Sequence, residues 1–193
     1  MLGFMGISSG ERKVDRLIRS YKAERPLPLD GVLSEWQSAD RAVLEGPAMG
    51  SYPRRPTVRT LWDNRNLYFC FDVSSSKLQA VVNTRDGYNL WLDDGVEFLI
   101  DSHPHRTKEF LSDNFAYHIN TLNTVFDDRE TPSGSPDPGW DGIAQHAVEL
   151  LGDFRYLVEV AVTWTEIGLE PQEDHTAIGV DSCVNGRDPQ TGE

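Results

Sequence analysis

The stretch WLDDGVEFLID, Trp91 to Asp101, decides the fold because it joins a turn to an alternating strand. From Val96 onward every second side chain is apolar, which is the period of a β-strand that buries one face. Val96, Phe98 and Ile100 should therefore point into a core, and Glu97 should lie outside it.

Trp91 stands just before the Asp-Asp-Gly turn that starts this strand. An indole and the Glu97 carboxylate should therefore lie near each other at one sheet surface. A ring that covers sugar C–H groups, beside an acceptor for sugar hydroxyls, is the chemistry of a polyol-binding face. The alternative is that Trp91 packs under a loop and Glu97 is an ordinary solvated strand residue.

The same alternation recurs along the chain and predicts further strands. They are the segment with Val58, Thr60 and Trp62, then Asn66–Val73, Asn114–Thr121, Arg155–Trp164 and Ala177–Asn185. In Asn66–Val73 one side should be buried, with Tyr68, Cys70 and Asp72 on the other. Many short strands separated by turn residues predict an all-β antiparallel sandwich, of immunoglobulin-like or jelly-roll type.

Residues 8–25 instead follow a helical period. Ser8 and Glu11 have capping-box spacing, and apolar residues recur three and four positions apart. The opposite face is basic, so this amphipathic helix is either a contact for a membrane surface or acidic partner, or a packed or solvated appendage. Pro26 should end it. The predicted division is a helical appendage over residues 1–25 and a sandwich domain over 26–193.

Composition narrows the class of protein. The chain has 193 residues, of which 38% are hydrophobic and 25% charged, as expected of one globular domain. The net charge of -13 argues against nucleic acid as a partner, because phosphates would be repelled. Neither a membrane-spanning run nor a signal peptide is recognisable, so we expect the chain as given to be soluble. A piece of a longer secreted protein is compatible with this. Cys70 and Cys183 are too few for a disulfide framework, and each is expected to be a small buried thiol.

His118 and Asn120 fall on the outward register of their predicted strand, so they join Trp91 and Glu97 as candidates for a sugar-binding face. Taken alone, His118 reads as an exposed strand histidine. Glu97 and Glu159 are both expected on solvent-facing registers and resemble the carboxylate pair of a glycosidase, whose spacing a sequence does not reveal. The strong enzyme motifs are missing from the sequence, which favours a binding module over an enzyme.

An acidic stretch from Phe126 to Gly142 suggests a structural calcium ion. Carboxylate oxygens on a folded-back loop are what calcium takes, although the spacing is not that of an EF-hand. The candidate ligands are Asp127, Asp128, Asp137 and Asp141. The alternative is a solvated acidic loop.

Taken together, the motifs resemble carbohydrate-binding module family 9 over about residues 27 to 186. Those motifs, in order, are LPLDGVLSEWQSAD, TVRTLWDNRNLYFCFDV, WLDDGVEFLID, NFAYHIN, YLVEVAVTWTEIGLEP and IGVDSCVNG. The resemblance implies two packed antiparallel sheets, bound calcium, and noncatalytic recognition of sugars, often chain ends, by stacked Trp residues. It also implies an extracellular or cell-surface location and other domains of a longer polysaccharide-acting protein as neighbours.

Carried over by motif, Trp91 matches the family's stacking aromatic and Glu97 its hydrogen-bonding acid. His118 occupies a place where the family can have arginine, while Asn120 and Asn185 match family asparagines. The family's second, late Trp has no counterpart after Trp164. Three explanations are open: a truncated chain, a substitute aromatic such as Trp140 or Tyr88, or a member that does not bind sugar in this way.

Two other functions are compatible with such a sandwich. One is a haem-binding electron-transfer domain, in which Met49 and His118 would be the axial ligands. The other is a cell-surface structural or interaction domain that has lost the sugar site.

Overall fold

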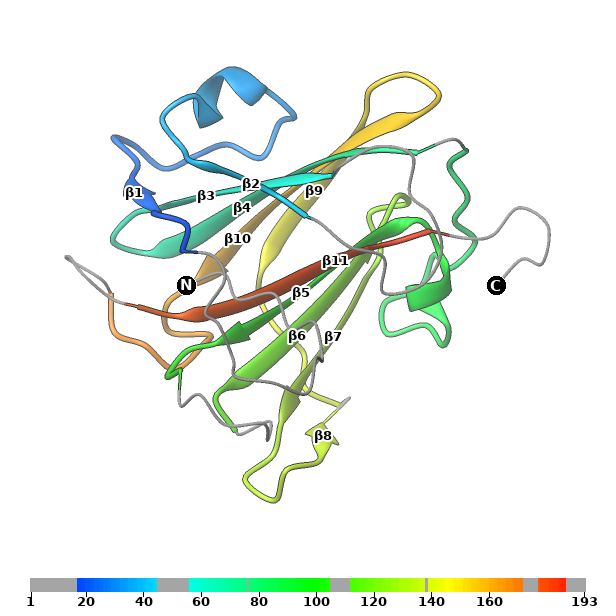
Figure 1. Ribbon diagram of the computed structural model, residues 1–193. Coiled ribbons are helices and arrows are strands. Elements are labelled where there is room, and N and C mark those ends of the chain that lie inside the picture. Colours follow the sequence, from blue (N-terminus) through cyan, green and yellow to red (C-terminus); the bar gives the residue numbers. More distant parts are fainter. Residues whose placement is uncertain are drawn as a thin grey trace, which may run out of the picture.

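The protein folds as two β-sheets packed face to face (Figure 1). The structure is a computed structural model that describes residues 17–44, 56–75, 77–104, 112–137, 139–171 and 177–186. One sheet has six strands in the order β1-β3-β4-β10-β9, with β2 also pairing β3, and the other has five in the order β11-β5-β6-β7-β8. All pairings are antiparallel except β1 with β3. The antiparallel sandwich expected from the alternating segments is confirmed.

The six-stranded sheet consists of β1 (Tyr21–Lys22), β2 (Arg41–Val43), β3 (Thr57–Trp62), β4 (Asn66–Ser74), β9 (Gln145–Leu150) and β10 (Arg155–Thr163). The five-stranded sheet consists of β5 (Gly95–Asp101), β6 (Asn114–Asn120), β7 (Val125–Glu130), β8 (Pro136–Asp137) and β11 (Gly179–Asn185). Two short 3-10 helices, η1 (Leu33–Trp36) and η2 (Leu90–Leu92), lie in the connections.

The main core fills the space between the sheets, as the alternation predicts. Phe69 and Phe71 of β4 face Phe98 of β5, with ring centroids 4.9 and 5.6 Å from the Phe98 ring, and Tyr117 of β6 stacks on Phe98 at 4.9 Å. All four rings are fully buried. Such aromatic contacts add to the area buried and fix how the two sheets pack.

A second apolar cluster covers the outer face of the six-stranded sheet. Trp36, fully buried, packs with Tyr68, Cys70 and Ala161, and Leu27, Leu29 and Leu33 contact the cluster from the N-terminal segment. The expectation that the Tyr68 side of β4 would face solvent is therefore wrong. A period of two shows which residues share a face, but not whether a distant segment will cover that face.

The predicted N-terminal helix does not extend over the residues that the structure describes. Residues 1–16 lie outside the described part, and within 17–25 Tyr21 and Lys22 form β1, parallel to β3. Ala23 N–H then donates to the Trp62 carbonyl at 2.7 Å, and the Lys22 ammonium lies 5.1 Å from the Trp62 ring centroid. Pairing with an available sheet edge and cation–π contact outweigh a weak helical pattern here.

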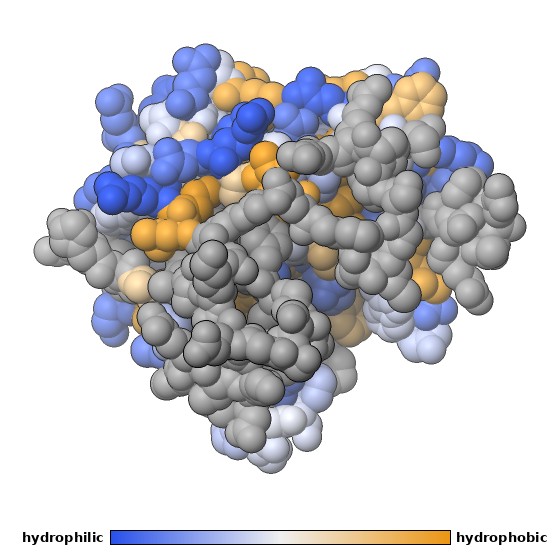
Figure 2. Space-filling view, in the orientation of Figure 1, coloured by the Kyte–Doolittle hydropathy of each residue, from blue (hydrophilic) through white to orange (hydrophobic). Residues whose placement is uncertain are grey.

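Within the described residues, no helix is long and apolar enough to cross a bilayer. On the face drawn in Figure 2, hydrophobic and hydrophilic side chains are interspersed over the described residues. Both cysteines are free: Cys70 is buried, as predicted, whereas Cys183 is partly exposed.

Candidate functional site

The outer face of the five-stranded sheet carries a row of side chains that crosses four strands. Cys183 of β11 pairs with Glu97 of β5, Glu97 with His118 of β6, and His118 with Phe126 of β7. Side chains of directly paired residues point to the same side of an antiparallel sheet, so these four form one continuous line. Glu97 and His118 are thus brought together on the outer face, as predicted.

Glu97 is the polar centre of this row. Its Oε2 lies 3.3 Å from His118 Nδ1 and accepts from Asn185 Nδ2 and from the Cys183 thiol, each at 3.5 Å. The Glu97 side chain keeps about a quarter of its surface exposed, 26%. Its neighbours restrain the carboxylate, while part of it stays available to a ligand.

Burial sets the protonation of the neighbouring groups. It lowers the pKa of His118, although the Glu97 and Asp128 carboxylates pull that pKa upward. At neutral pH the imidazole is therefore mainly neutral, and its contact with Glu97 is not an ion pair. Burial, reinforced by Glu97, raises the pKa of the Cys183 thiol to about 12, so this group stays protonated and acts as a weak donor.

An aromatic platform adjoins the end of the row. The Trp91 ring of η2 stands edge-on to Phe126, with centroids 5.9 Å apart, and edge-on to Tyr88 at 5.4 Å. His118 also packs edge-on against Phe126, at 5.7 Å. Trp91 is 36% exposed and Tyr88 81%. Phe126 therefore links an exposed aromatic surface to the polar row.

Asn120 has the outward register predicted for it, but it is fully buried and so is not part of the exposed row. Its amide donates to the Val82 carbonyl at 2.7 Å and to Asp93 Oδ2 at 3.0 Å, and its Oδ1 accepts from Leu122 N and Thr124 N. The register does point Asn120 outward, but the 79–82 segment folds over the end of β6. Asn120 therefore fixes this segment and the β6–β7 turn.

The two aromatics considered as substitutes for a second Trp are in different places. Tyr88 contacts Trp91, whereas Trp140 packs against Phe115 and Tyr117, which belong to the inner face of β6. The prediction that places Trp140 on the sugar-binding face is therefore wrong.

Glu159 is 1% exposed, so its predicted solvent-facing position is also wrong. Its Oε1 accepts from Trp36 Nε1 at 2.7 Å and its Oε2 from the backbone N–H of Gly31 at 2.6 Å. It lies under the segment that covers the six-stranded sheet, whereas Glu97 lies on the outer face of the other sheet. The two carboxylates do not form a glycosidase pair.

The four acids predicted to bind calcium do not gather at one point, because residues 125–130 form strand β7 rather than a loop. Asp127 points inward from β7, while Asp128 shares the outer register of Ala116. Asp137 lies in β8, 3.7 Å from Arg129. Among the described residues only Asp127 and Asp141 come together, and they do so with Asp86.

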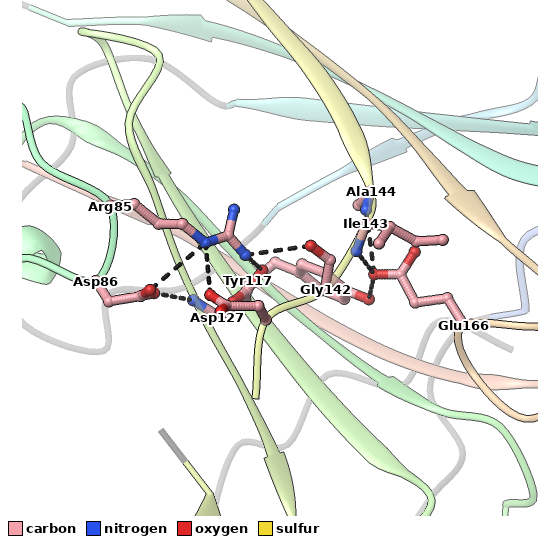
Figure 3. Close-up of polar contacts among 9 residues, drawn as sticks. Arg85, Asp86, Tyr117, Asp127, Gly142, Ile143, Ala144 and Glu166 are labelled. Carbon is pink, nitrogen blue, oxygen red and sulfur yellow. Dashed lines mark hydrogen bonds and ion pairs between the residues drawn. The ribbon is translucent and has the colours of Figure 1, made fainter. Parts of the chain in front are cut away.

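The Asp86–Asp127–Asp141 cluster contains a cation of the protein itself. The Arg85 guanidinium contacts all three carboxylates, as Figure 3 shows in part. Burial raises the pKa of Asp127 to about 6, against the opposing effect of Arg85.

Sequence reasoning missed Phe126, Cys183 and Arg85. Phe126 was assigned to a loop, although its position opposite His118 follows once residues 125–130 are read as a strand. Cys183 lies at the same alternating position of β11 as Asn185, two residues on. The Arg85 cluster brings together residues 85–86, Asp127 and Asp141, which are separated in the sequence. No local sequence pattern therefore predicts it. Met49, one of the predicted haem ligands, lies outside the described residues.

Residues 29–193 match the family model described as carbohydrate family 9 binding domain-like. The chain belongs to this family. Its sandwich resembles that of a family 9 carbohydrate-binding module from Caldicellulosiruptor kristjanssonii, solved in complex with glucose, with a TM-score of 0.67 at 20% identity. That alignment covers 88% of this chain and 79% of the other. The cellotriose complex from the same organism also gives a TM-score of 0.67 at 20% identity, covering 89% and 78% of the two chains.

Curated relatives of this family member are larger proteins. Endo-1,4-beta-xylanase A of Thermotoga maritima is 31% identical over 160 residues, and its namesake from Thermotoga neapolitana is 29% identical over 160 residues. In both cases the match covers 81% of this chain. The chain corresponds to only 14% of each xylanase.

Proposed function

We propose that this family 9 domain binds carbohydrate without cleaving it, through the outer face of its five-stranded sheet. The observation that carries the proposal is the polar row centred on Glu97, which ends beside the exposed Trp91. A sugar ring has an apolar face, which an indole can cover, and a rim of hydroxyls, which carboxylate, imidazole and amide groups can engage. Solved family members with glucose and cellotriose support short glucans as the ligand class.

In this proposal Trp91 stacks on the sugar, and Tyr88 takes the part of a second aromatic. Glu97, His118 and Asn185 bind the hydroxyls. Asn120 supports the site indirectly, because it holds the segment beside η2. The buried Glu159, bonded to Trp36, supports a noncatalytic role, since it is not available as a partner acid for Glu97.

The wider role we propose is that of an accessory module in a longer polysaccharide-acting protein outside the cell. Its similarity to one part of two xylanases supports this role. Polysaccharides outside the cell are too large to cross a membrane unaided. A module that binds them must therefore itself be outside the cell.

The test is a calorimetric titration with cellotriose, xylotriose and glucose on the wild type and on Trp91→Ala. Removing a stacked indole should cost about 2 kcal/mol of binding free energy, or roughly a thirtyfold loss of affinity. Trp140→Phe is the control, because Trp140 lies against the inner face of β6 and should leave the affinity unchanged. Wild-type affinity in Trp91→Ala, or a folded wild type that binds none of the three sugars, would contradict the proposal.

A further inference from the structure

Arg85 lies at the meeting point of three carboxylates that come from three separate segments. Its guanidinium is 2.6 Å from Asp127 Oδ2, 2.9 Å from Asp141 Oδ1 and 3.4 Å from Asp86 Oδ2, and it donates to the Gly142 carbonyl at 3.2 Å. Figure 3 shows this side chain reaching from its own segment across to β7 and to the residues that precede β9.

The carboxylates have the spacing of a cation site. Asp86, Asp127 and Asp141 each offer an oxygen, and these oxygens all lie within 4.8 Å of one another. Asp127 is 1% exposed, and its Oδ1 is buried without a hydrogen-bond partner. A carboxylate this deep in the protein needs a positive partner, because burial of an unpaired charge is very unfavourable.

The space between these carboxylates already holds the guanidinium. A divalent ion placed there would lie within a few ångströms of another full positive charge, and the buried side of the cluster, formed by Asp127, screens that repulsion less than bulk water does. The residues present therefore do not fit a calcium ion as long as Arg85 keeps this position. We infer that Arg85 is the built-in cation of this carboxylate cluster and makes a divalent ion unnecessary there.

Close packing at Gly142 and hydrogen bonds to Glu166 hold the backbone next to the Arg85 cluster in place. A side chain at Gly142 would come within 3.0 Å of Asp127 Oδ2, so glycine allows the chain to approach the cluster. Behind it, Glu166 accepts from Tyr117 OH at 3.0 Å, Ile143 N at 2.9 Å and Ala144 N at 3.1 Å (Figure 3). These bonds tie the segment that carries the Gly142 carbonyl to β6 and to the turn after β10.

Arg85 also holds the start of the aromatic platform. Asp86 N–H donates to the Val125 carbonyl at 3.0 Å, and Asp86 Oδ1 accepts from Asp127 N at 3.4 Å. The chain then runs directly through Tyr88 to Trp91. Arg85 adds a side-chain anchor to these bonds of Asp86, because it pairs with Asp127 and Asp141. It is therefore a positioning residue for these rings, and this part of the inference rests on the proposed carbohydrate function.

The test counts calcium ions bound per chain, by calorimetry after removal of metal with chelator. Arg85→Ser should bind one calcium ion more than the wild type, because the three carboxylates then lack their cation. Adding Asp141→Asn to Arg85→Ser should weaken that ion roughly tenfold or more, since ligand charge sets calcium affinity. In the wild-type background Asp141→Asn should leave the count unchanged. Arg129→Ser is the control, because Arg129 pairs with Asp137 and not with this cluster.

Two results would overturn the inference. Loss of a calcium ion from the wild type on Asp141→Asn would mean that the carboxylates hold metal despite Arg85. A folded Arg85→Ser protein with no additional ion would mean that they are not a cation site. If Arg85→Ser folds only when calcium is present, the inference stands. If Arg85→Ser does not fold at all, the comparison of calcium ions bound by the wild type and by Asp141→Asn decides whether the inference stands.

Sugar affinity separates the positioning role from the cation role. Arg85→Ser should bind cellotriose more weakly in chelator than in calcium, because the ion restores the anchor of the aromatic segment. The wild type should bind it equally in both. If no variant binds sugar, the proposed function fails, but the calcium counts still decide the role of Arg85. If Arg85→Ser gains the ion yet binds sugar equally with and without calcium, the positioning role fails.

Discussion

Replacing Glu159 by alanine should loosen the N-terminal segment from the six-stranded sheet. The Glu159 carboxylate joins β10 to this segment through two short bonds, from Trp36 Nε1 at 2.7 Å and from Gly31 N at 2.6 Å. Its side chain and the Trp36 ring are both buried. Alanine would remove both acceptors and leave the buried Trp36 Nε1–H and the partly buried Gly31 N–H without partners.

The magnitude follows from these contacts. A hydrogen bond to a charged group contributes about 1.5–3 kcal/mol, so losing two should cost about 3–6 kcal/mol of unfolding free energy. Part of this is offset because a buried carboxylate no longer has to be desolvated. Against a typical total of roughly 5–15 kcal/mol, the loss is large. Glutamine keeps the shape and one acceptor, so Glu159→Gln should lose about half as much.

Chemical denaturation followed by tryptophan fluorescence measures this, because Trp36 reports directly on the covering segment. Glu24→Ala is the matched control, as Glu24 is exposed, and it should change stability by less than about 0.5 kcal/mol. Cellotriose affinity of folded Glu159→Ala should equal that of the wild type. Undiminished stability would refute the role assigned to the two bonds, and lost sugar binding in a stable protein would place Glu159 in the ligand site instead.

Two further predictions concern the start of β5. Burial, with a contribution from Asp93, raises the pKa of Asp94 to about 6, so its charged form opposes folding above that pH and no longer does so below about 4, the unfolded value. Asp94→Asn should therefore raise stability by about 1–3 kcal/mol at neutral pH, with the gain fading between pH 6 and 4; a gain that persists at acid pH would contradict this. Gly95→Ala should destabilise the protein by about 1–3 kcal/mol or more in denaturant titration, because a Cβ would lie 2.8 Å from Asn120 Cα and would also meet the Ile119 carbonyl; wild-type stability would show that β6 can move away.

Much of the fold could be predicted because alternation is a local signal with a direct physical cause. Phe98 and Tyr117 had to be buried together once their strands were recognised, since each shares a face with other apolar residues. The six- and five-stranded arrangement could not be derived in the same way, because strand order depends on contacts between distant segments. The parallel pairing of Tyr21 with Leu61 is such a contact, and it stands in place of the last part of a predicted helix.

The site was predictable only where its residues lie within one strand or one strand pair. Glu97 and His118 met as expected because their strands are neighbours in the sheet. Asn120 has the same outward register as His118, yet the Asp93 carboxylate and the 79–82 segment enclose it. The alternation was right about its direction, and a connection far away in sequence decided its burial.

The outer faces of the two sheets present different side chains. For this reason we expect one face to contribute to stability and the other to sugar binding. On the six-stranded sheet the outer face offers Tyr68 and Cys70, and the apolar segment around Trp36 covers it. On the five-stranded sheet the outer face offers Glu97 and His118, whose polar groups would lose hydration under an apolar cover without gaining partners. Substitutions at Glu159 and at Trp91 should therefore act on different quantities, the first on unfolding and the second on sugar affinity. Arg85 should affect both, because its carboxylate cluster anchors the aromatic segment to the body of the sandwich.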